Sequence, residues 1–399
     1  MEGLALIAPV PEGASQTSNQ TNPFVRYRHL LRAHDIWQTS GRSDATFVSL
    51  VESLDGAVFA VDGTGFRMTP LRKYAALDNE LGLAVWVKDE TGNVSGSHKG
   101  RHLFGLAVLL RVVDALGLGP QRRSPPLVIA SCGNAALAAA VIAAALGRRL
   151  EVFVPEDAES SVVERLTVLG ATITVCPRDP QTSGDPCYHR FVDAVAAGAV
   201  PFGCQGPDNG LTIEGGQSLG WEMAEQLSAA GVAADRLVVQ VGGGALASAC
   251  IAGLDEAVAL DVIHRRPIFD TVQTAAASPL ARAVALMRQQ HVPLDLAVHQ
   301  RSRFMWPWES RPHSIATGIL DDETYDWASV AAGMFETGGE AMVVDEATLR
   351  EANAVARRTT DINVDHTGSA GLAGLMRLVR DKRAAPGEQV VVIFSGVAR

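Results

Sequence analysis

The sequence is poor in cysteine and lacks the cysteine spacing of a disulfide framework or a structural zinc site. Five cysteines are spread over 399 residues, an odd number, and no two form a Cys-x-x-Cys pair. Disulfide scaffolds and zinc modules need paired or closely spaced cysteines. We therefore expect reduced thiols and no metal site. The five are Cys132, Cys176, Cys187, Cys204 and Cys250.

Long apolar runs and dense basic segments are also missing. The apolar run at residues 3–10 follows Glu2 without a basic segment and is too short for a secretory or membrane-spanning segment. Lys and Arg total 34 against 44 Asp and Glu, a formal net charge of -10. This balance argues against nucleic acid and anionic membranes as partners, and we expect a cytoplasmic location.

Short apolar strands alternate with alanine-rich helical segments from residue 84 onward. Apolar runs without polar alternation, each separated from the next by a helix, are typical of strands buried on both faces of parallel sheets. The predicted fold class is therefore α/β, with open, doubly wound and mostly parallel sheets. Strands are predicted at residues 84–88, 127–130, 150–154, 171–175, 237–241 and 389–394, and helices at 99–116, 135–146, 160–169, 216–229, 245–254, 347–358 and 368–382.

Two segments are expected to lie outside the core. Residues 11–23 are polar and contain Pro, Gly and Asn, so residues 1–23 are interpreted as a flexible N-terminal arm. Residues 299–315 are rich in Arg, Trp and Pro and are predicted to form a long surface loop or insertion.

Lys99 carries the clearest chemical signal. It follows small, turn-forming residues and stands at the start of a predicted helix. The positive end of a helix dipole disfavours a cation, and so favours a neutral, nucleophilic amine that can form a Schiff base. Taken alone, the pattern also fits a lysine that merely follows a polar loop. Its interpretation depends on the other loops at strand ends.

Three further loops follow predicted strands, where open α/β sheets bind ligands. The loop at 131–135 opens an alanine-rich helix, and its backbone amides with the Ser131 hydroxyl would form a socket for a carboxylate, although it also fits a helix cap. The loop at 242–246 begins with three glycines, which suit a phosphate cradle or a tight turn. It is neither a dinucleotide-binding nor a Walker motif. Ser395 ends the last strand and offers a hydroxyl to a pocket.

Together these loops supply an amine, a carboxylate socket, a phosphate cradle and a polar end-stop, the contacts that pyridoxal 5'-phosphate with a bound amino acid requires. The sequence resembles the fold type II pyridoxal-phosphate enzymes, which include threonine synthase, threonine dehydratase, cysteine synthase and the tryptophan synthase β-subunit. The resemblance runs from about Thr69 to Ala398. Threonine synthase-like members carry Lys-x-Glu-x-x-Asn-x-x-Gly-Ser-x-Lys-x-Arg, and this pattern is matched in order and spacing by Lys88, Glu90, Asn93, Gly96, Ser97, Lys99 and Arg101.

The resemblance implies a pyridoxal 5'-phosphate cofactor bound between two lobes. It implies that Lys99 forms the internal aldimine and then removes the α-proton of the substrate. Asn134 would contact the cofactor's ring oxygen, Ser395 its pyridine nitrogen, and His98 would lie near the phosphate. The phosphate itself would be held by Gly242, Gly243, Gly244, Ala245 and Leu246. The substrate carboxylate would be bound by the loop of Ser131, Cys132, Gly133, Asn134 and Ala135, although Cys132 also fits a small buried thiol.

The implied reaction is elimination or replacement at the β or γ carbon of an amino acid, most like threonine synthase. A β-eliminating ammonia-lyase, of the threonine, serine or diaminopropionate type, is the alternative. Departures from the threonine synthase pattern at His98 and Gly100 keep that alternative open. A third possibility is a catalytically inactive binding protein with the same fold. His98 and His102 stand four residues apart, but no carboxylate at a matching position supports a metal pair.

The predicted domain organisation has two lobes. Residues 24–104 and 205–399 are expected to form a large cofactor-binding lobe, and residues 105–204 a smaller mobile lobe that carries the substrate-carboxylate loop. A small amino-acid substrate and a homodimer are expected from the resemblance.

Overall fold

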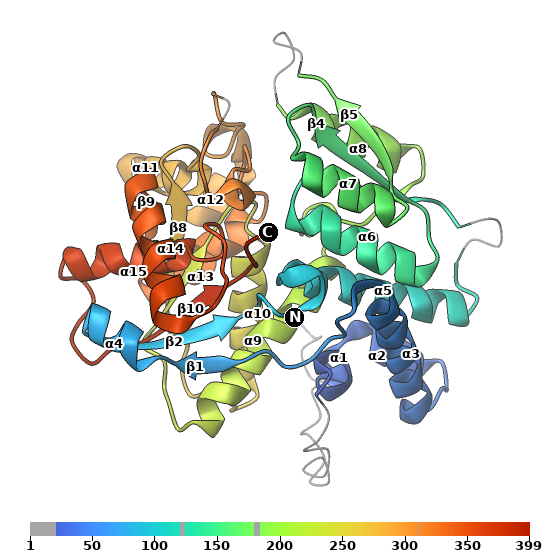
Figure 1. Ribbon diagram of the computed structural model, residues 1–399, viewed down its shortest axis with the longest axis horizontal. Coiled ribbons are helices and arrows are strands. Elements are labelled where there is room, and N and C mark those ends of the chain that lie inside the picture. Colours follow the sequence, from blue (N-terminus) through green and yellow to red (C-terminus); the bar gives the residue numbers. More distant parts are fainter. Residues whose placement is uncertain (1–20, 120–123, 179–183, 311) are drawn as a thin grey trace.

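The computed structural model describes residues 21–119, 124–178, 184–310 and 312–399. They form two lobes, each built on an open sheet flanked by helices (Figure 1). The predicted α/β class with two largely parallel sheets is confirmed. Most of the predicted N-terminal arm, residues 1–20, lies outside the described residues, and the chain enters helix α1 at Pro23.

The larger lobe contains a six-stranded sheet in the order β1-β2-β10-β7-β8-β9. All neighbouring strands are parallel except β1 and β2. The last strand, β10, lies inside the sheet, between β2 and β7. The strands are β1 (Leu71–Lys73), β2 (Ala84–Asp89), β7 (Arg236–Gln240), β8 (Ile268–Thr274), β9 (Ala341–Val344) and β10 (Gln389–Phe394).

Helices cover both faces of this sheet, which explains why its strands are apolar without alternation. Along β10, Val391 and Ile393 pack into one hydrophobic core, whereas Val390 and Val392 pack into the core on the opposite face. The first face is covered by α9 (Leu211–Ala229), α10 (Ala245–Ala259), α11 (Pro279–Gln290), α12 (Leu294–His299) and α13 (Trp327–Thr337). The second is covered by α4 (Ala75–Leu81), α14 (Glu346–Thr360) and α15 (Ala370–Arg380).

The smaller lobe contains a four-stranded, all-parallel sheet in the order β5-β4-β3-β6. Its strands are β3 (Leu127–Ala130), β4 (Leu150–Pro155), β5 (Thr172–Cys176) and β6 (Val200–Pro201), and its helices are α6 (Asn134–Leu146), α7 (Ser160–Val168) and α8 (Pro186–Ala196). Helix α5 (Lys99–Ala115) packs against both α6 and α9, and so joins the two lobes.

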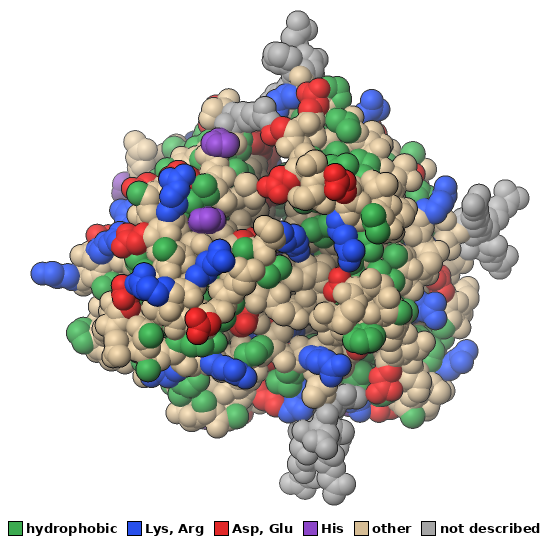
Figure 2. All heavy atoms as spheres, in the orientation of Figure 1, with side chains coloured by type: hydrophobic (Ala, Val, Ile, Leu, Met, Phe, Trp, Pro, Cys, Tyr) green, Lys and Arg blue, Asp and Glu red, His purple; other side chains and the backbone are tan. Residues whose placement is uncertain are grey.

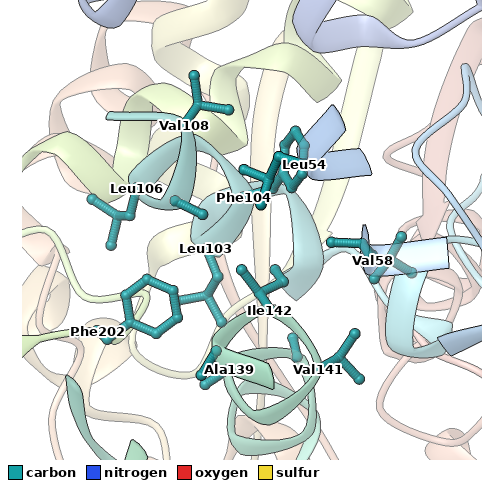
Figure 3. Close-up of a cluster of buried hydrophobic side chains, with 14 of the residues drawn as sticks. Leu54, Val58, Leu103, Phe104, Leu106, Val108, Ala139, Val141, Ile142 and Phe202 are labelled. Carbon is teal, nitrogen blue, oxygen red and sulfur yellow. The ribbon is translucent and has the colours of Figure 1, made fainter. Parts of the chain in front are cut away.

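The N-terminal helices share a hydrophobic core with α5 and α6 (Figure 3). Leu54 and Val58 on α3 lie in one cluster with Leu103 and Phe104 on α5 and Ile142 on α6. The N-terminal elements are α1 (Pro23–Arg26), α2 (Arg32–Thr39) and α3 (Asp44–Asp62), with short 3-10 turns at Arg28–Leu30, Val94–Gly96, Arg301–Arg303 and Thr317–Ile319 elsewhere along the chain. The lobe boundaries at residues 104/105 and 204/205 stay a prediction. Helix α3 packs against α6 of the smaller lobe, whereas α1 contacts α9 of the larger lobe and α2 packs on α5.

Several elements differ from the sequence prediction. β8 was not predicted because Asp270 and Gln273 interrupt its apolar pattern, yet both are buried, and Asp270 is paired with Arg236. The surface loop predicted at 299–315 is wrong at Phe304 and Met305, which are fully buried in the core of the larger lobe. Within the described parts of the chain, no helix is long and apolar enough to span a membrane.

Candidate functional site

Lys99 is placed by a loop that turns sharply between β2 and α5. Ser95 and Gly96 both adopt positive φ, 57° and 68°, which reverses the chain just before the lysine. The loop is held by the segment after β10: the His98 N–H donates to the Ser395 carbonyl at 3.1 Å, and the Val397 N–H donates to the Gly96 carbonyl at 2.9 Å. The start of α5 and the end of β10 therefore form one unit.

A buried ionic cluster lies behind this loop. The Lys88 ammonium is 2.5 Å from the Glu222 carboxylate, and the Arg101 guanidinium is 2.9 Å from both Glu90 and Glu222. Burial opposes ionisation of Glu90, but Arg101 and Lys88 hold the pKa of Glu90 below its ordinary value. Asn93 donates to Glu90 at 2.7 Å. Lys88, Glu90, Asn93 and Arg101 thus hold the lysine loop from behind.

Helix α5 approaches α9 closely just after Lys99, through glycines. A Cβ on Gly105 would lie 2.6 Å from the Cα of Gly215, and one on Gly215 would lie 2.5 Å from the Arg101 carbonyl oxygen. Gly216 likewise leaves room for the buried His102 ring, and burial lowers the pKa of His102 to about 3. The glycines allow the helix that begins with Lys99 to pack directly on the larger lobe.

One cavity brings Lys99 together with the predicted phosphate loop and Ser395. It encloses about 460 Å³ of non-atom space, including open solvent at its mouth. The lining residues are His98, Lys99, Cys204, Gln205, Gln240, Gly242, Gly243, Gly244, Ala245, Leu246, Gly318, Ile319, Asp321, Thr367 and Ser395.

The glycine turn between β7 and α10 has the features of an anion cradle. Gly244 adopts a φ of 99°, and a Cβ on Gly242 would lie 2.8 Å from the Cα of Ile319, so only glycine fits there. The turn opens α10, and backbone N–H groups at a helix N-terminus attract anions. The Asp321 carboxyl group lies against this turn, and a Cβ on Gly243 would be 3.4 Å from its Oδ1. Burial raises the pKa of Asp321, and Lys99 and the Gly243 N–H oppose that shift.

Ser395 is oriented as a hydrogen-bond donor by Gln240. The Gln240 side-chain NH₂ faces the carbonyls of Gly368 and Ile393, both at 3.1 Å, so its contact with Ser395 Oγ at 2.7 Å must also be a donation. The Ser395 hydroxyl accepts this bond and retains its own hydrogen for another partner. Such a hydroxyl matches an acceptor, as an unprotonated pyridine nitrogen would be.

His98 offers a further polar atom to the same cavity. Its Nδ1 is 3.2 Å from the Ser395 carbonyl, while its Nε2 is buried and has no hydrogen-bond partner among the described residues. Burial, together with the nearby Lys99, lowers the pKa of His98 well below its ordinary value, so the ring is neutral. The Nδ1 must then carry the hydrogen that the carbonyl accepts, and Nε2 is an acceptor.

The predicted substrate loop lies on the smaller lobe, and none of its residues 131–135 lines the cavity described above. Asn134 begins α6, and its side-chain oxygen accepts a hydrogen bond from Arg399. Cys132 is exposed. Packing around its sulfur, and then Asp157, Asp185 and Asp321, raise the pKa of Cys132 to about 11.

Gln240 and Asp321 are cavity residues that sequence reasoning missed. Gln240 ends β7 after three apolar residues, and a polar residue at a strand end was a usable signal. Asp321 follows a 3-10 turn in a segment without periodicity, so no pattern marked it.

A family model described as pyridoxal-phosphate dependent enzyme matches residues 64–396. A threonine synthase of Methanocaldococcus jannaschii is 24% identical over 332 residues, which cover 82% of this chain and 74% of that protein. Among solved structures, a threonine deaminase from T.th. superposes with a TM-score of 0.65 at 21% identity, covering 87% of this chain and 98% of that one. A maize serine racemase gives 0.63 at 20% identity, covering 87% and 93%.

Proposed function

This chain belongs to the pyridoxal-phosphate dependent enzyme family, and from that premise we propose that it catalyses elimination or replacement at the β or γ carbon of an amino acid. Its cofactor is pyridoxal 5'-phosphate. The observation that carries the proposal is the single cavity that contains the Lys99 amine, the glycine turn and the Ser395 hydroxyl. When bound, the cofactor supplies a ring that stabilises negative charge at the substrate's α carbon.

The residues of the cavity suit this cofactor. Lys99 would hold it covalently through Nζ, and the N–H groups at Gly243 to Leu246 would bind its phosphate. The Ser395 hydroxyl would donate to the ring nitrogen without protonating it, because a hydroxyl is a far weaker acid than a carboxylic acid. A neutral ring withdraws electrons less strongly, which suits elimination and replacement.

Lys99 would also move the proton. Once the substrate has displaced it, the Nζ amine takes the proton from the α carbon, and the electron pair of the C–H bond stays on the substrate. A leaving group at the β carbon then departs with its own bonding pair as the α-carbon pair forms a Cα–Cβ double bond. Departure from the γ carbon first requires removal of a proton from the β carbon. The buried cluster behind the loop keeps Nζ at one position through both roles.

Acidic side chains around the substrate loop support the ammonia-lyase type as a second candidate. Asp157, Asp185 and Asp321 all act electrostatically on Cys132 in that loop. Figure 2 shows acidic side chains along the upper rim of the hollow between the lobes. A negative field disfavours a substrate that carries a phosphate dianion, as a threonine synthase substrate does, and tolerates serine, threonine or a cationic diaminopropionate.

The first test is the colour of the purified protein. The wild type should absorb visible light from lysine-bound cofactor, and Lys99→Ala should lose this absorbance while retaining the wild-type far-ultraviolet circular dichroism. If the wild type is colourless and added pyridoxal phosphate does not restore the colour, the proposal is refuted. The alternative of a catalytically inactive binding protein with the same fold would then remain.

The second test identifies the reaction. Release of 2-oxoacid from serine, threonine or diaminopropionate would support the ammonia-lyase type. Formation of threonine from O-phosphohomoserine would support the threonine synthase type. If a coloured protein converted none of these four amino acids, the proposed elimination or replacement would be refuted for these substrates.

A further inference from the structure

Asp321 lies where the cofactor phosphate is proposed to bind. It follows the 3-10 turn Thr317–Ile319 and lines the same cavity as Lys99. A Cβ on Gly242 would overlap its carboxylate, and a Cβ on Gly243 would lie 3.4 Å from its Oδ1. Burial raises the pKa of Asp321, and the nearby Lys99 and the Gly243 N–H oppose that shift. The turn expected to bind phosphate therefore already has a carboxyl group packed against it.

Few other groups hold this carboxylate in place. Among the residues that the structure describes, no arginine or lysine forms an ion pair with Asp321, although Lys99 acts on it electrostatically. The next residue behaves differently: Asp322 is paired with Arg178 at 3.4 Å, and its carbonyl accepts from the Trp308 N–H at 3.0 Å. The backbone is thus anchored beside Asp321, while its side chain packs against Gly242 and Gly243 and lies close to its own backbone N–H.

A carboxylate and a phosphate cannot share this position. One backbone N–H donates one strong hydrogen bond, and two anions at contact distance in a partly buried cavity repel each other. An ionised acceptor forms a stronger hydrogen bond with a backbone N–H than a neutral one does, so a carboxylate beside the turn competes with phosphate for its amides.

We propose that the Asp321 carboxylate is an internal anion that occupies the phosphate cradle, and that the cofactor binds by displacing it. This inference rests on the proposed function, since it assumes that the cradle takes the cofactor phosphate. The carboxylate fills part of the cradle in the empty protein and lowers its affinity for the cofactor. Removing the charge while keeping the shape therefore strengthens cofactor binding.

The test compares Asp321→Asn with Asp322→Asn in the full-length protein. Both substitutions remove one negative charge from adjacent positions with almost no change in volume, but only the first removes the anion from the cradle. Equilibrium dialysis against pyridoxal phosphate measures bound cofactor at each concentration. Asp321→Asn should bind about tenfold more tightly than the wild type, equivalent to ~1.4 kcal/mol, and Asp322→Asn should bind like the wild type.

Inorganic phosphate provides a second measurement that does not involve Lys99. Phosphate should raise the melting temperature of cofactor-stripped Asp321→Asn at lower concentrations than it does for the wild type. Asp321→Ser serves if the asparagine variant fails to fold. Equal or weaker binding by the Asp321 variants, or equal tightening by Asp322→Asn, would overturn the inference. If no form binds pyridoxal phosphate, the proposed function fails instead.

Discussion

Replacing Glu222 with glutamine tests whether the buried ionic cluster holds the lysine loop. Glu222 is fully buried and balances two cations, Lys88 and Arg101, while Glu90 supplies the other negative charge. Glu222→Gln leaves two buried cations facing one carboxylate. It also directs an amide N–H at either Lys88 or Arg101, both of which can only donate.

The expected cost follows from these distances. Two unit charges about 3 Å apart attract by about 5 kcal/mol at an effective dielectric constant of about 20. The glutamine oxygen retains part of the hydrogen bonding, and breaking buried pairs costs about 3–5 kcal/mol. We therefore expect Glu222→Gln to lower the free energy of unfolding by about 3–5 kcal/mol. Arg358→Gln, which breaks an exposed pair with Glu80, should cost less than about 1 kcal/mol.

The assay is urea unfolding at one fixed cofactor concentration, because bound cofactor adds to the apparent stability. Lys88→Met, a substitution of similar volume, leaves one negative charge in excess. The double variant Lys88→Met/Glu222→Gln is again balanced, with Arg101 facing Glu90. It should therefore be less destabilised than the sum of the single variants. A Glu222→Gln cost below about 1 kcal/mol, or strict additivity in the double variant, would refute the reasoning.

Three further predictions concern other parts of the site. The Arg399 guanidinium can only donate hydrogen bonds, so it orients the Asn134 side chain with its oxygen toward Arg399. Arg399→Gln should shift the pH titration of the visible absorbance of the cofactor-loaded protein by about half a pH unit or more, and Arg399→Lys should largely restore the wild-type titration. Gly215→Ala should cost about 1–3 kcal/mol of unfolding free energy in thermal denaturation, since its Cβ would meet α5, whereas Gly56→Ala in the open face of α3 should be neutral or stabilising. Burial raises the pKa of Asp365 to about 6. The native state therefore binds more protons than the unfolded state between about pH 4 and pH 6, and the free energy of unfolding falls as the pH rises through that window. Asp365→Asn should stabilise the protein by about 1–3 kcal/mol at pH 7 but not at pH 4, and an equal effect at both pH values would contradict the assignment.

The sheets could be predicted where a strand is apolar on both faces. The predicted strand at 389–394 coincides with β10, and that at 127–130 with β3, because both are buried on each side by helices. β8 could not be found in this way. Its Asp270 is stabilised by Arg236, which is adjacent in the sheet but distant in the sequence. Only the strand order reveals that partner.

The candidate site could be predicted only for residues that follow a strand recognisable from its apolar sequence. Lys99, the glycine turn and Ser395 each follow an apolar strand, so the ends of β2, β7 and β10 pointed to them. The roles assigned to them remain predictions. Asp321 could not be identified, because its place depends on how tightly the turn ending at Ile319 packs against Gly242. That is a contact between segments with no pattern of their own.

The position of β10 inside the larger sheet has a consequence for the order in which the protein can assemble. During synthesis, β2 and β7 emerge long before the strand that must lie between them, so each leaves an unpaired edge until residues 389–394 are available. The lysine loop also awaits its partners at Ser395 and Val397. A nascent or C-terminally truncated chain therefore exposes two strand edges without hydrogen-bond partners and an incomplete cavity. We expect such a chain to be bound by chaperones or degraded by proteases. The larger sheet and the cavity around Lys99 are therefore completed only when β10 is inserted.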